Sequence, residues 1–181
     1  MPDGFRFSVK MPKTITHQRK LMDCGELLGA HLADSSALGG KLAVHLVQLP
    51  PSLAFDVAVA GAFFAGLSQA SGAIACEPRH PSWFTSEADA LLTDHRVARV
   101  AADPAKVPEA ARPGGWPGLA YFRLHGSPVI YRSTYDDARL DEWAAAIRAA
   151  GADETWCIFD NTAGSAAAGN AMALGGRIAE Q

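Results

Sequence analysis

The chain has 181 residues, of which 49% are hydrophobic and 19% are charged. At roughly 150 residues per domain, this length predicts a single domain over residues 1–181. The composition is too apolar and too weakly charged for a disordered chain, which stays unfolded because it cannot bury enough surface. The formal net charge of −3 gives no overall basic field that would attract nucleic acid or an acidic membrane.

The sequence predicts a cytoplasmic protein that does not cross a membrane. Its longest apolar run, residues 57–67, is shorter than the ~18 residues that a membrane span needs. The first residues do not combine a charged region with an apolar run, as a secretory signal does. Three cysteines lie far apart in the chain, which predicts neither a disulfide framework nor a zinc knuckle.

Six apolar segments have the pattern of β-strands, and helical patterns separate most of them. The predicted strands are residues 5–10, 42–49, 73–76, 97–101, 119–124 and 155–159. Apolar residues at helical spacing predict helices near 21–28, across 54–69, around 140–147 and across 165–179. Ser86 and Asp89 have the spacing of a capping box at the start of one further helix.

The alternation of strands and helices predicts an α/β fold with a parallel sheet that helices cover. About six strand–helix units are recognisable, whereas a closed (β/α)8 barrel needs eight units and typically about 250 residues. Two architectures remain open on this pattern. One is an open, doubly wound sheet, and the other is a barrel that lacks its first two units.

Each predicted strand ends in polar or charged residues. They are Lys10, Gln48, Glu77 with Arg79, Asp103, Arg123 with His125, and Asp160 with Asn161. Residues two apart on a strand share a face, and the carboxyl ends of parallel strands surround the active site in both candidate architectures. The sequence therefore predicts one shared polar site at this end of the sheet.

Structural roles compete with this prediction at single positions. Arg123 and Glu77 can form an ion pair across the sheet, and Asp160 can cap the helix that follows it. His45 lies in the middle of a strand and predicts a core histidine, whereas His31 lies on a presumed helix and is expected at the surface. An unpaired charge inside a sheet is costly, so charged residues at so many strand ends together favour a functional site.

Two kinds of chemistry fit the acidic and histidine residues at these ends. A divalent zinc, manganese or magnesium ion is one, with Glu77, His80, His125 and Asp160 as candidate ligands, although no short-range ligand motif connects them. Without a metal, Glu77 and Asp160 can divide acid and base roles if their environments differ.

Two loops border the predicted site. Residues 160–165 lead from a strand into a helix, where free backbone N–H groups can hold an anion. The loop that runs from His125 to Tyr131 and Tyr135 is either a flexible lid or a set of aromatic residues packed at the rim.

Several segments resemble the YecE-like family, a barrel family of unknown function. The matching segments are residues 7–12 with 15–17, residues 48–52, the Glu-Pro-Arg-His-Pro-Ser-Trp segment 77–83, residues 123–126, Tyr131, Tyr135, and residues 159–162 with 170–171. The resemblance runs along the whole chain and implies a TIM-barrel-like fold with about six parallel strand–helix units. Family members begin with two further units that do not appear here. The resemblance thus implies an incomplete barrel with an unpaired sheet edge near residues 5–10, which favours self-association.

The function that these residues favour is hydrolysis of a small anionic, phosphate-containing substrate at the carboxyl ends of the strands. Glu77, His125 and Asp160 are the predicted catalytic residues. The residues predicted to bind the substrate or its anion are Lys10, His17, Gln48, Arg79, His80, Trp83, Arg123, Tyr131 and Asn161.

Two other functions stay open. One is a nucleic-acid-binding module without catalysis, in which Lys10, Arg79 and Arg123 hold phosphates while Trp83 or Tyr131 stacks on a base. The negative net charge counts against it. The other is that the chain is an inactive, shortened member of the family.

Overall fold

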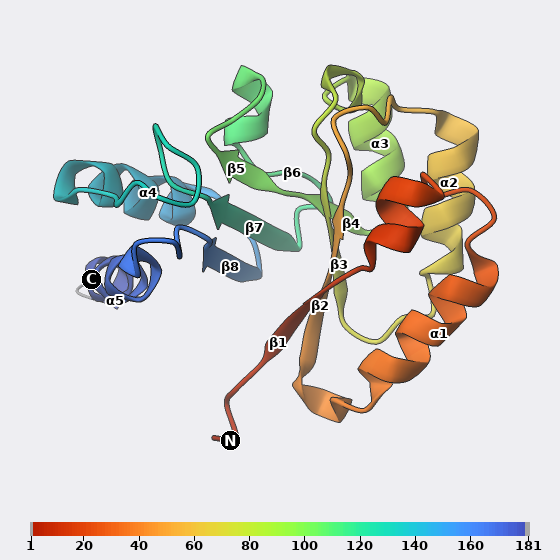
Figure 1. The fold of residues 1–181 in the computed structure, drawn as a ribbon, viewed down its shortest axis with the longest axis horizontal. Coiled ribbons are helices and arrows are strands. Elements are labelled where there is room, and N and C mark those ends of the chain that lie inside the picture. Colours follow the sequence, from red (N-terminus) through yellow and green to blue (C-terminus); the bar gives the residue numbers. More distant parts are fainter. Residues whose placement is uncertain (1, 180–181) are drawn as a thin grey trace.

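The computed structural model describes residues 2–179, which form alternating strands and helices (Figure 1). The strands are β1 (Phe7–Lys10), β2 (Leu42–Gln48), β3 (Ala73–Glu77), β4 (Val97–Arg99), β5 (Ala101–Asp103), β6 (Gly114–Gly115), β7 (Leu119–Leu124) and β8 (Glu154–Phe159). The α-helices are α1 (Gly25–Ser36), α2 (Val57–Gly66), α3 (Ser86–Asp94), α4 (Asp137–Ala149) and α5 (Ala166–Ala179). Four short helical turns add Thr14–Gln18, Gly39–Lys41, Pro81–Trp83 and Pro108–Ala111.

The strands form two sheets. The first sheet has the order β1-β2-β3-β4-β6 and the second the order β5-β7-β8. The strands pair in parallel throughout, except that the short β6 runs antiparallel to β4. The predicted α/β class with parallel strands is confirmed.

The strand predicted at residues 97–101 is wrong, because the chain there divides into two strands. β4 pairs with β3 in the first sheet, whereas β5 pairs with β7 in the second. Val100, between them, still donates its N–H to the Cys76 carbonyl at 2.8 Å. A continuous apolar run does not record that successive residues pair with different neighbours, so the pattern alone predicts one strand.

The period of two along each strand sends alternate side chains to opposite faces. On the outer face of the first sheet, Val47 and Cys76 pack with residues of α1, α2 and α3 in one buried cluster, including Phe64 of α2. On the outer face of the second sheet, Phe122 packs with Trp143 of α4 and with α5. The two groups of helices lie on opposite sides of the strands (Figure 1).

The inner faces of both sheets share a third apolar cluster. Leu46, Ala75 and Tyr121 belong to it, and Trp156 and Ile158 of β8 pack against it while half-buried. This inner layer joins the two sheets, and it forms the floor beneath the carboxyl ends of the strands.

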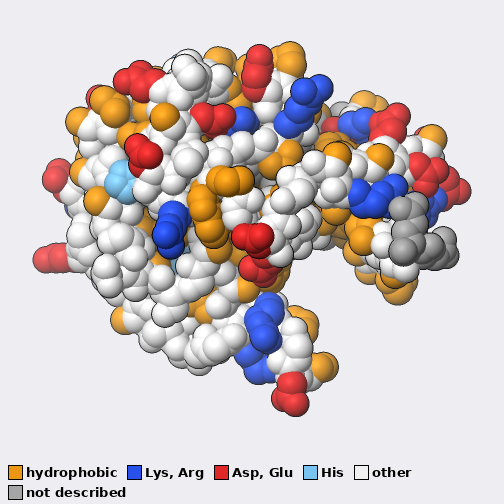
Figure 2. Space-filling view, turned by 180° about the vertical axis from the view of Figure 1, so that it is seen from behind, with side chains coloured by type: hydrophobic (Ala, Val, Ile, Leu, Met, Phe, Trp, Pro, Cys, Tyr) orange, Lys and Arg blue, Asp and Glu red, His pale blue; other side chains and the backbone are white. Residues whose placement is uncertain are grey.

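The strands curve around this layer without closing. Among residues 2–179, β1 and β8 each pair with a single strand. Figure 2 shows a hollow between the N-terminal end of the chain and the part that carries α4 and α5. No helix within residues 2–179 is long and apolar enough to cross a bilayer.

Two local predictions are corrected. α3 is capped by Thr85, which accepts a hydrogen bond from the Ala88 N–H at 3.3 Å, rather than by Ser86. His31 is buried rather than at the surface, because its Nε2 lies 3.1 Å from Nδ1 of His45. His45 is a core histidine, as predicted, and its Nε2 lies 3.0 Å from the Ser71 carbonyl.

Candidate functional site

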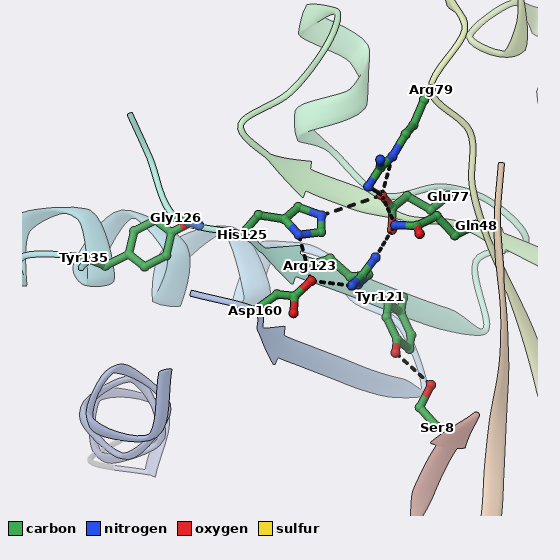
Figure 3. Close-up of polar contacts among 10 residues, drawn as sticks. All are labelled: Ser8, Gln48, Glu77, Arg79, Tyr121, Arg123, His125, Gly126, Tyr135 and Asp160. Carbon is green, nitrogen blue, oxygen red and sulfur yellow. Dashed lines mark hydrogen bonds and ion pairs between the residues drawn. The ribbon is translucent and has the colours of Figure 1, made fainter. Parts of the chain in front are cut away.

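The polar ends of four of the six predicted strands converge above the inner apolar layer, whereas Asp103 instead binds Tyr135 and Arg139. The alternation that places Tyr121 inside continues along the chain, so Arg123 and His125 also point inward. Neighbouring strands contribute to the same place (Figure 3). The polar cluster consists of Gln48, Glu77 and Arg79 from the first sheet and its loops, and Arg123, His125 and Asp160 from the second.

Glu77 is the most completely bonded residue of the polar cluster. Its side chain is 2% exposed. Oε1 accepts two hydrogen bonds from Arg79, at 2.9 and 3.0 Å, and Nε2 of Gln48 lies 3.1 and 3.3 Å from the two carboxylate oxygens. Oε2 also pairs with Nη1 of Arg123. The ion pair across the sheet that the sequence left open therefore exists.

These contacts decide the charge of Glu77. Burial alone would raise the pKa of this carboxyl, but the nearby His125 and the positive charges of Arg123 and Arg79 outweigh burial and hold the pKa well below its ordinary value. A carboxylate this acidic, with both oxygens occupied, is a poor proton acceptor. Glu77 is therefore better described as a positioning residue than as the catalytic residue that the sequence suggested.

His125 and Asp160 form the reactive half of the polar cluster. Nδ1 of His125 lies 3.0 Å from Oδ2 of Asp160, and the same oxygen accepts a 2.7 Å bond from Arg123. The ionised carboxylate can only accept, so the proton of the imidazole lies on Nδ1. Nε2 is buried, lies 3.6 Å from Oε1 of Glu77, and has no hydrogen-bond partner within residues 2–179.

A cavity of about 190 Å³ opens beside this histidine. Its polar lining comes from Glu77, Arg79, His125 and Lys106. Lys106 is exposed and follows β5, whereas Arg79 keeps 26% of its side chain exposed while it pairs with Glu77. Because Glu77 is already neutralised by two guanidinium groups, the charge that the cavity offers to a ligand is positive.

Lys10 adds to the positive rim of this region, and His17 lies near it. Lys10 is exposed at the end of β1, and His17 lies in the short helical turn that follows it. Partial burial, together with the positive charges of Lys13, Arg79 and Lys10, lowers the pKa of His17. His17 therefore lies near the predicted site but is uncharged at neutral pH, so it adds no positive charge to the rim.

The loop from His125 to Tyr135 is tied down by buried polar groups. The Tyr135 hydroxyl donates to Oδ2 of Asp103 at 2.8 Å and accepts from the Gly126 N–H at 2.9 Å. Gly126 has φ +93°, and a Cβ there would lie 2.9 Å from the Ser133 carbonyl oxygen. Glycine is required at this position.

Asn161 belongs to this loop support. It is fully buried and donates to the Ser133 carbonyl at 3.0 Å and to Oδ1 of Asn170 at 2.9 Å. Asn170 in turn binds both the N–H and the carbonyl of Tyr135. Asn161 therefore holds the loop in place instead of binding a ligand, and the loop is a fixed rim and not a flexible lid.

Two other predicted binding residues have structural roles. Trp83 is 1% exposed, packs in the core of the first sheet, and donates its indole N–H to the Leu53 carbonyl at 3.0 Å. Nδ1 of His80 accepts from the Ser82 N–H at 3.2 Å and caps the turn that begins at Pro81. We leave Trp83 and His80 out of the candidate site, because their contacts serve the fold.

The four predicted metal ligands do not form a metal site, although Glu77, His125 and Asp160 lie together in the polar cluster. Within the described part of the chain, no three His, Cys, Asp or Glu side chains are grouped to hold a metal ion. His80 is used as a cap, and the oxygens of Glu77 are occupied by guanidinium and amide groups. Two arginines thus supply the positive charge that a metal would bring to these carboxylates.

Sequence reasoning missed three residues of this region. Lys106 lies in the proline-rich stretch after β5, where its place beyond a strand end was the available signal. Tyr121 precedes Arg123 by two and so shares its face, and its hydroxyl lies 2.8 Å from Oγ of Ser8. That contact joins β7 to β1 across the inner layer, which no local pattern predicts.

Comparison with known proteins follows this geometry. The family model described as "Protein of unknown function DUF72" matches residues 1–181. The chain belongs to the DUF72 family. A crystal structure of a DUF72 family protein from Thermotoga maritima is similar to it, with a TM-score of 0.80 and 26% identity over 97% of this chain and 73% of that one. No curated protein matches the chain.

The family assignment agrees with the resemblance to a family of unknown function and supports the α/β fold. It carries no activity, and the polar cluster and its cavity are the features of this DUF72 chain that bear on its function.

Proposed function

We propose that this DUF72 chain is a hydrolase that acts on a small phosphate-containing substrate, with His125 as the residue that transfers the proton. One observation carries the proposal: His125, whose buried Nε2 has no hydrogen-bond partner in the described chain, lines a cavity together with Arg79 and Lys106. An unpaired buried polar atom costs free energy, and a ligand or water in the cavity would supply the missing hydrogen bond.

The His125–Asp160 pair supports general base chemistry. Asp160 holds the proton on Nδ1, which leaves a lone pair on Nε2. Nε2 lies 3.6 Å from Oε1 of Glu77, and both residues line the cavity. Nε2 takes a proton from water as the water oxygen attacks phosphorus. The bond between phosphorus and the leaving oxygen then breaks, and the same proton passes from Nε2 to that oxygen. Asp160 stabilises the imidazolium that exists between these two transfers.

The cations around the cavity fit the charge of the substrate. Arg79 and Lys106 bind the phosphate oxygens and stabilise the negative charge that accumulates on them in the transition state. Arg123 is buried between Glu77 and Asp160 and fixes both carboxylates. Glu77, which itself accepts hydrogen bonds from Gln48, holds Arg79 in place, so Arg79 is positioned before the substrate arrives.

Assay of the purified chain against phosphomonoesters and phosphodiesters tests the proposal. We expect turnover of at least one class, and a loss of about 10²–10⁴-fold in kcat for His125→Gln, the usual contribution of a general acid–base group. His95→Gln is the matched control. His95 is half-buried near the amino ends of β3 and β4, beside Asp94 and Trp116 and away from the polar cluster.

Two results contradict the proposal. One is that neither class of ester is hydrolysed by the folded chain. The other is that both His125→Gln and the control His95→Gln retain the activity of the wild type. Circular dichroism and thermal unfolding of each variant separate loss of the catalytic group from loss of the fold.

A nucleic-acid-binding module is the second candidate. The observation in its favour is the additional positive rim, formed by Lys10 and Lys13 near Arg79. If phosphate contacts provide the affinity, binding of single-stranded DNA weakens steeply between about 50 and 200 mM salt. Binding that is absent, or independent of salt, removes this candidate.

We infer in addition that the curved sheets form part of a TIM-barrel-like fold. The similarity to the DUF72 structure from Thermotoga maritima supports this inference. The free edges of β1 and β8 can then pair with another strand. Sedimentation velocity at increasing concentration is expected to show self-association, and a strictly monomeric chain contradicts it.

A further inference from the structure

The cavity beside His125 is lined by two kinds of residue. Glu77, Arg79, Lys106 and His125 carry polar or charged groups, and the other residues form an apolar wall that includes Pro51, Ala110, Ile130 and Tyr131. A phosphate ion alone makes no use of an apolar wall. The volume of about 190 Å³ equals that of about six water molecules at ~30 Å³ each, which is more than a phosphate group requires.

Tyr131 is the aromatic residue on the apolar wall. Its side chain is 45% exposed, although exposed aromatic rings are costly in water. It packs edge to face on the His125 ring, with 5.9 Å between ring centroids and an interplanar angle of 88°. One ring thus contacts the catalytic histidine and still faces the space in which the substrate would lie.

The backbone holds Tyr131 in this exposed position. Its φ is +67°, in the left-handed region that bulky residues rarely adopt. Its N–H donates to the His125 carbonyl, and its carbonyl accepts from the Ala163 N–H at 3.0 Å. Strained backbone of this kind persists only when its surroundings enforce it, and it is concentrated at functional sites.

The enforcing surroundings are the buried contacts of the same loop. Tyr135 anchors Gly126 on one side, and Asn170 and Asn161 anchor residues 133–135 on the other. Two exposed apolar residues, Val129 and Ile130, precede Tyr131 between these anchors. The loop therefore presents an apolar surface in a fixed position above the anion-binding groups.

We propose that Tyr131 determines specificity at this site and that the substrate carries an aromatic ring next to its phosphate. This inference rests on the proposed function. The phosphate lies against Arg79 and Lys106, and the ring of the substrate lies against Tyr131 and Ile130. Aromatic rings in such contact gain affinity beyond the area they bury, so the site distinguishes aryl from small alkyl phosphates.

The test compares the binding of phenylphosphonate and methylphosphonate by titration calorimetry. Their carbon–phosphorus bond is not hydrolysed, so binding is measured without turnover. We expect the wild type to bind phenylphosphonate about 2- to 12-fold more tightly, the factor that an aromatic contact provides. Tyr131→Asn removes the ring but keeps a residue that tolerates positive φ, and it is expected to bind both compounds equally.

Tyr131→Phe keeps the ring and is expected to keep the preference. Phe5→Asn is the matched control, because Phe5 is also an aromatic residue with 45% exposure but precedes β1 at the opposite end from Lys10. It is expected to keep the preference as well.

The outcomes separate this inference from the proposed function. If the wild type binds both phosphonates with equal affinity, or if Tyr131→Asn keeps the preference, the role of Tyr131 is overturned while the anion site stands. If neither compound binds, both the inference and the proposed function are overturned. Loss of the aryl preference in Tyr131→Asn alone supports the inference.

Discussion

The two sheets contribute to the polar cluster in different ways. The first sheet supplies Gln48, Glu77 and Arg79, which form hydrogen bonds mainly with one another. The second sheet supplies His125, with a ring nitrogen that has no partner in the described chain, and Asp160, whose side chain stays 31% exposed. Arg123 links them by binding a carboxylate of each.

The two sheets also differ in how deeply their strands are buried. β3, in the middle of the first sheet, is buried along most of its length, whereas β8, at the edge of the second, is half-buried or exposed. Under the proposed function, the well-packed sheet supplies fixed charges, while its more open neighbour supplies the histidine that transfers the proton. Four predictions test this division of roles.

The largest effect is expected where the sheets are linked. Glu77→Gln leaves Arg123 and Arg79 without the buried carboxylate, and we expect a loss of about 3 kcal/mol in the free energy of unfolding. The loss lies at the lower end for buried pairs because Asp160 still binds Arg123. Urea denaturation measures it, and a change below about 1 kcal/mol contradicts the role of Glu77 as the link.

The double variant Glu77→Gln with Arg123→Met is the companion measurement. Because it removes both charges of the pair, it is expected to be less destabilised than the sum of the two single variants. Strict additivity would mean that the two side chains do not interact.

The next effect concerns the second sheet alone. Tyr135→Phe removes the hydroxyl shared by Asp103 and Gly126. Losing the partner of the buried Gly126 N–H and of Oδ2 of Asp103 costs about 1–3 kcal/mol, although Oδ1 of Asp103 still binds Arg139. Hydrogen exchange in residues 126–133 is expected to speed up. Tyr131→Phe, at an exposed position, is the control and is expected to change stability by less than about 0.5 kcal/mol.

The third prediction is a difference in pH dependence. Burial lowers the pKa of His31 and His45 below the ordinary value of 6.5, with each other's proximity adding to the effect at His31. The unfolded chain then binds more protons than the folded one as the pH falls through 6.5, so the first sheet loses stability there. The contribution of Glu77, whose pKa is lowered from 4.5, is kept until the pH falls below that value.

Urea midpoints between pH 8 and pH 5 measure this effect. The double variant His31→Leu with His45→Val removes both histidines. In this variant, most of the loss of stability around pH 6.5 is expected to disappear, and the loss that remains is due to His17. An unchanged decline in the double variant assigns the pH dependence to other groups.

The smallest effect is expected at the start of α3. Thr85→Ala removes the side chain that caps this helix and is expected to cost about 1 kcal/mol. Ser86→Ala is expected to change stability far less, since the cap lies one residue earlier. Equal losses for the two variants would contradict the position of the cap.

Local patterns go far in this protein where strands are straight and buried. The spacing of Arg123 and His125 predicts one shared face, and the structure confirms that these side chains share it, together with Tyr121. The same reasoning fails at residues 97–101, because pairing partners and not local composition decide where one sheet ends and the next begins.

The candidate site divides in the same way. Sequence alone determined that charged residues lie at the carboxyl ends of parallel strands, since the period of two and the direction of the chain suffice for that. Only the tertiary structure decided which charged groups are paired with one another and which polar atoms have no partner in the described chain. Neutralisation of Glu77 by two arginines, burial of Trp83 and the free nitrogen of His125 all depend on distances between segments far apart in the chain.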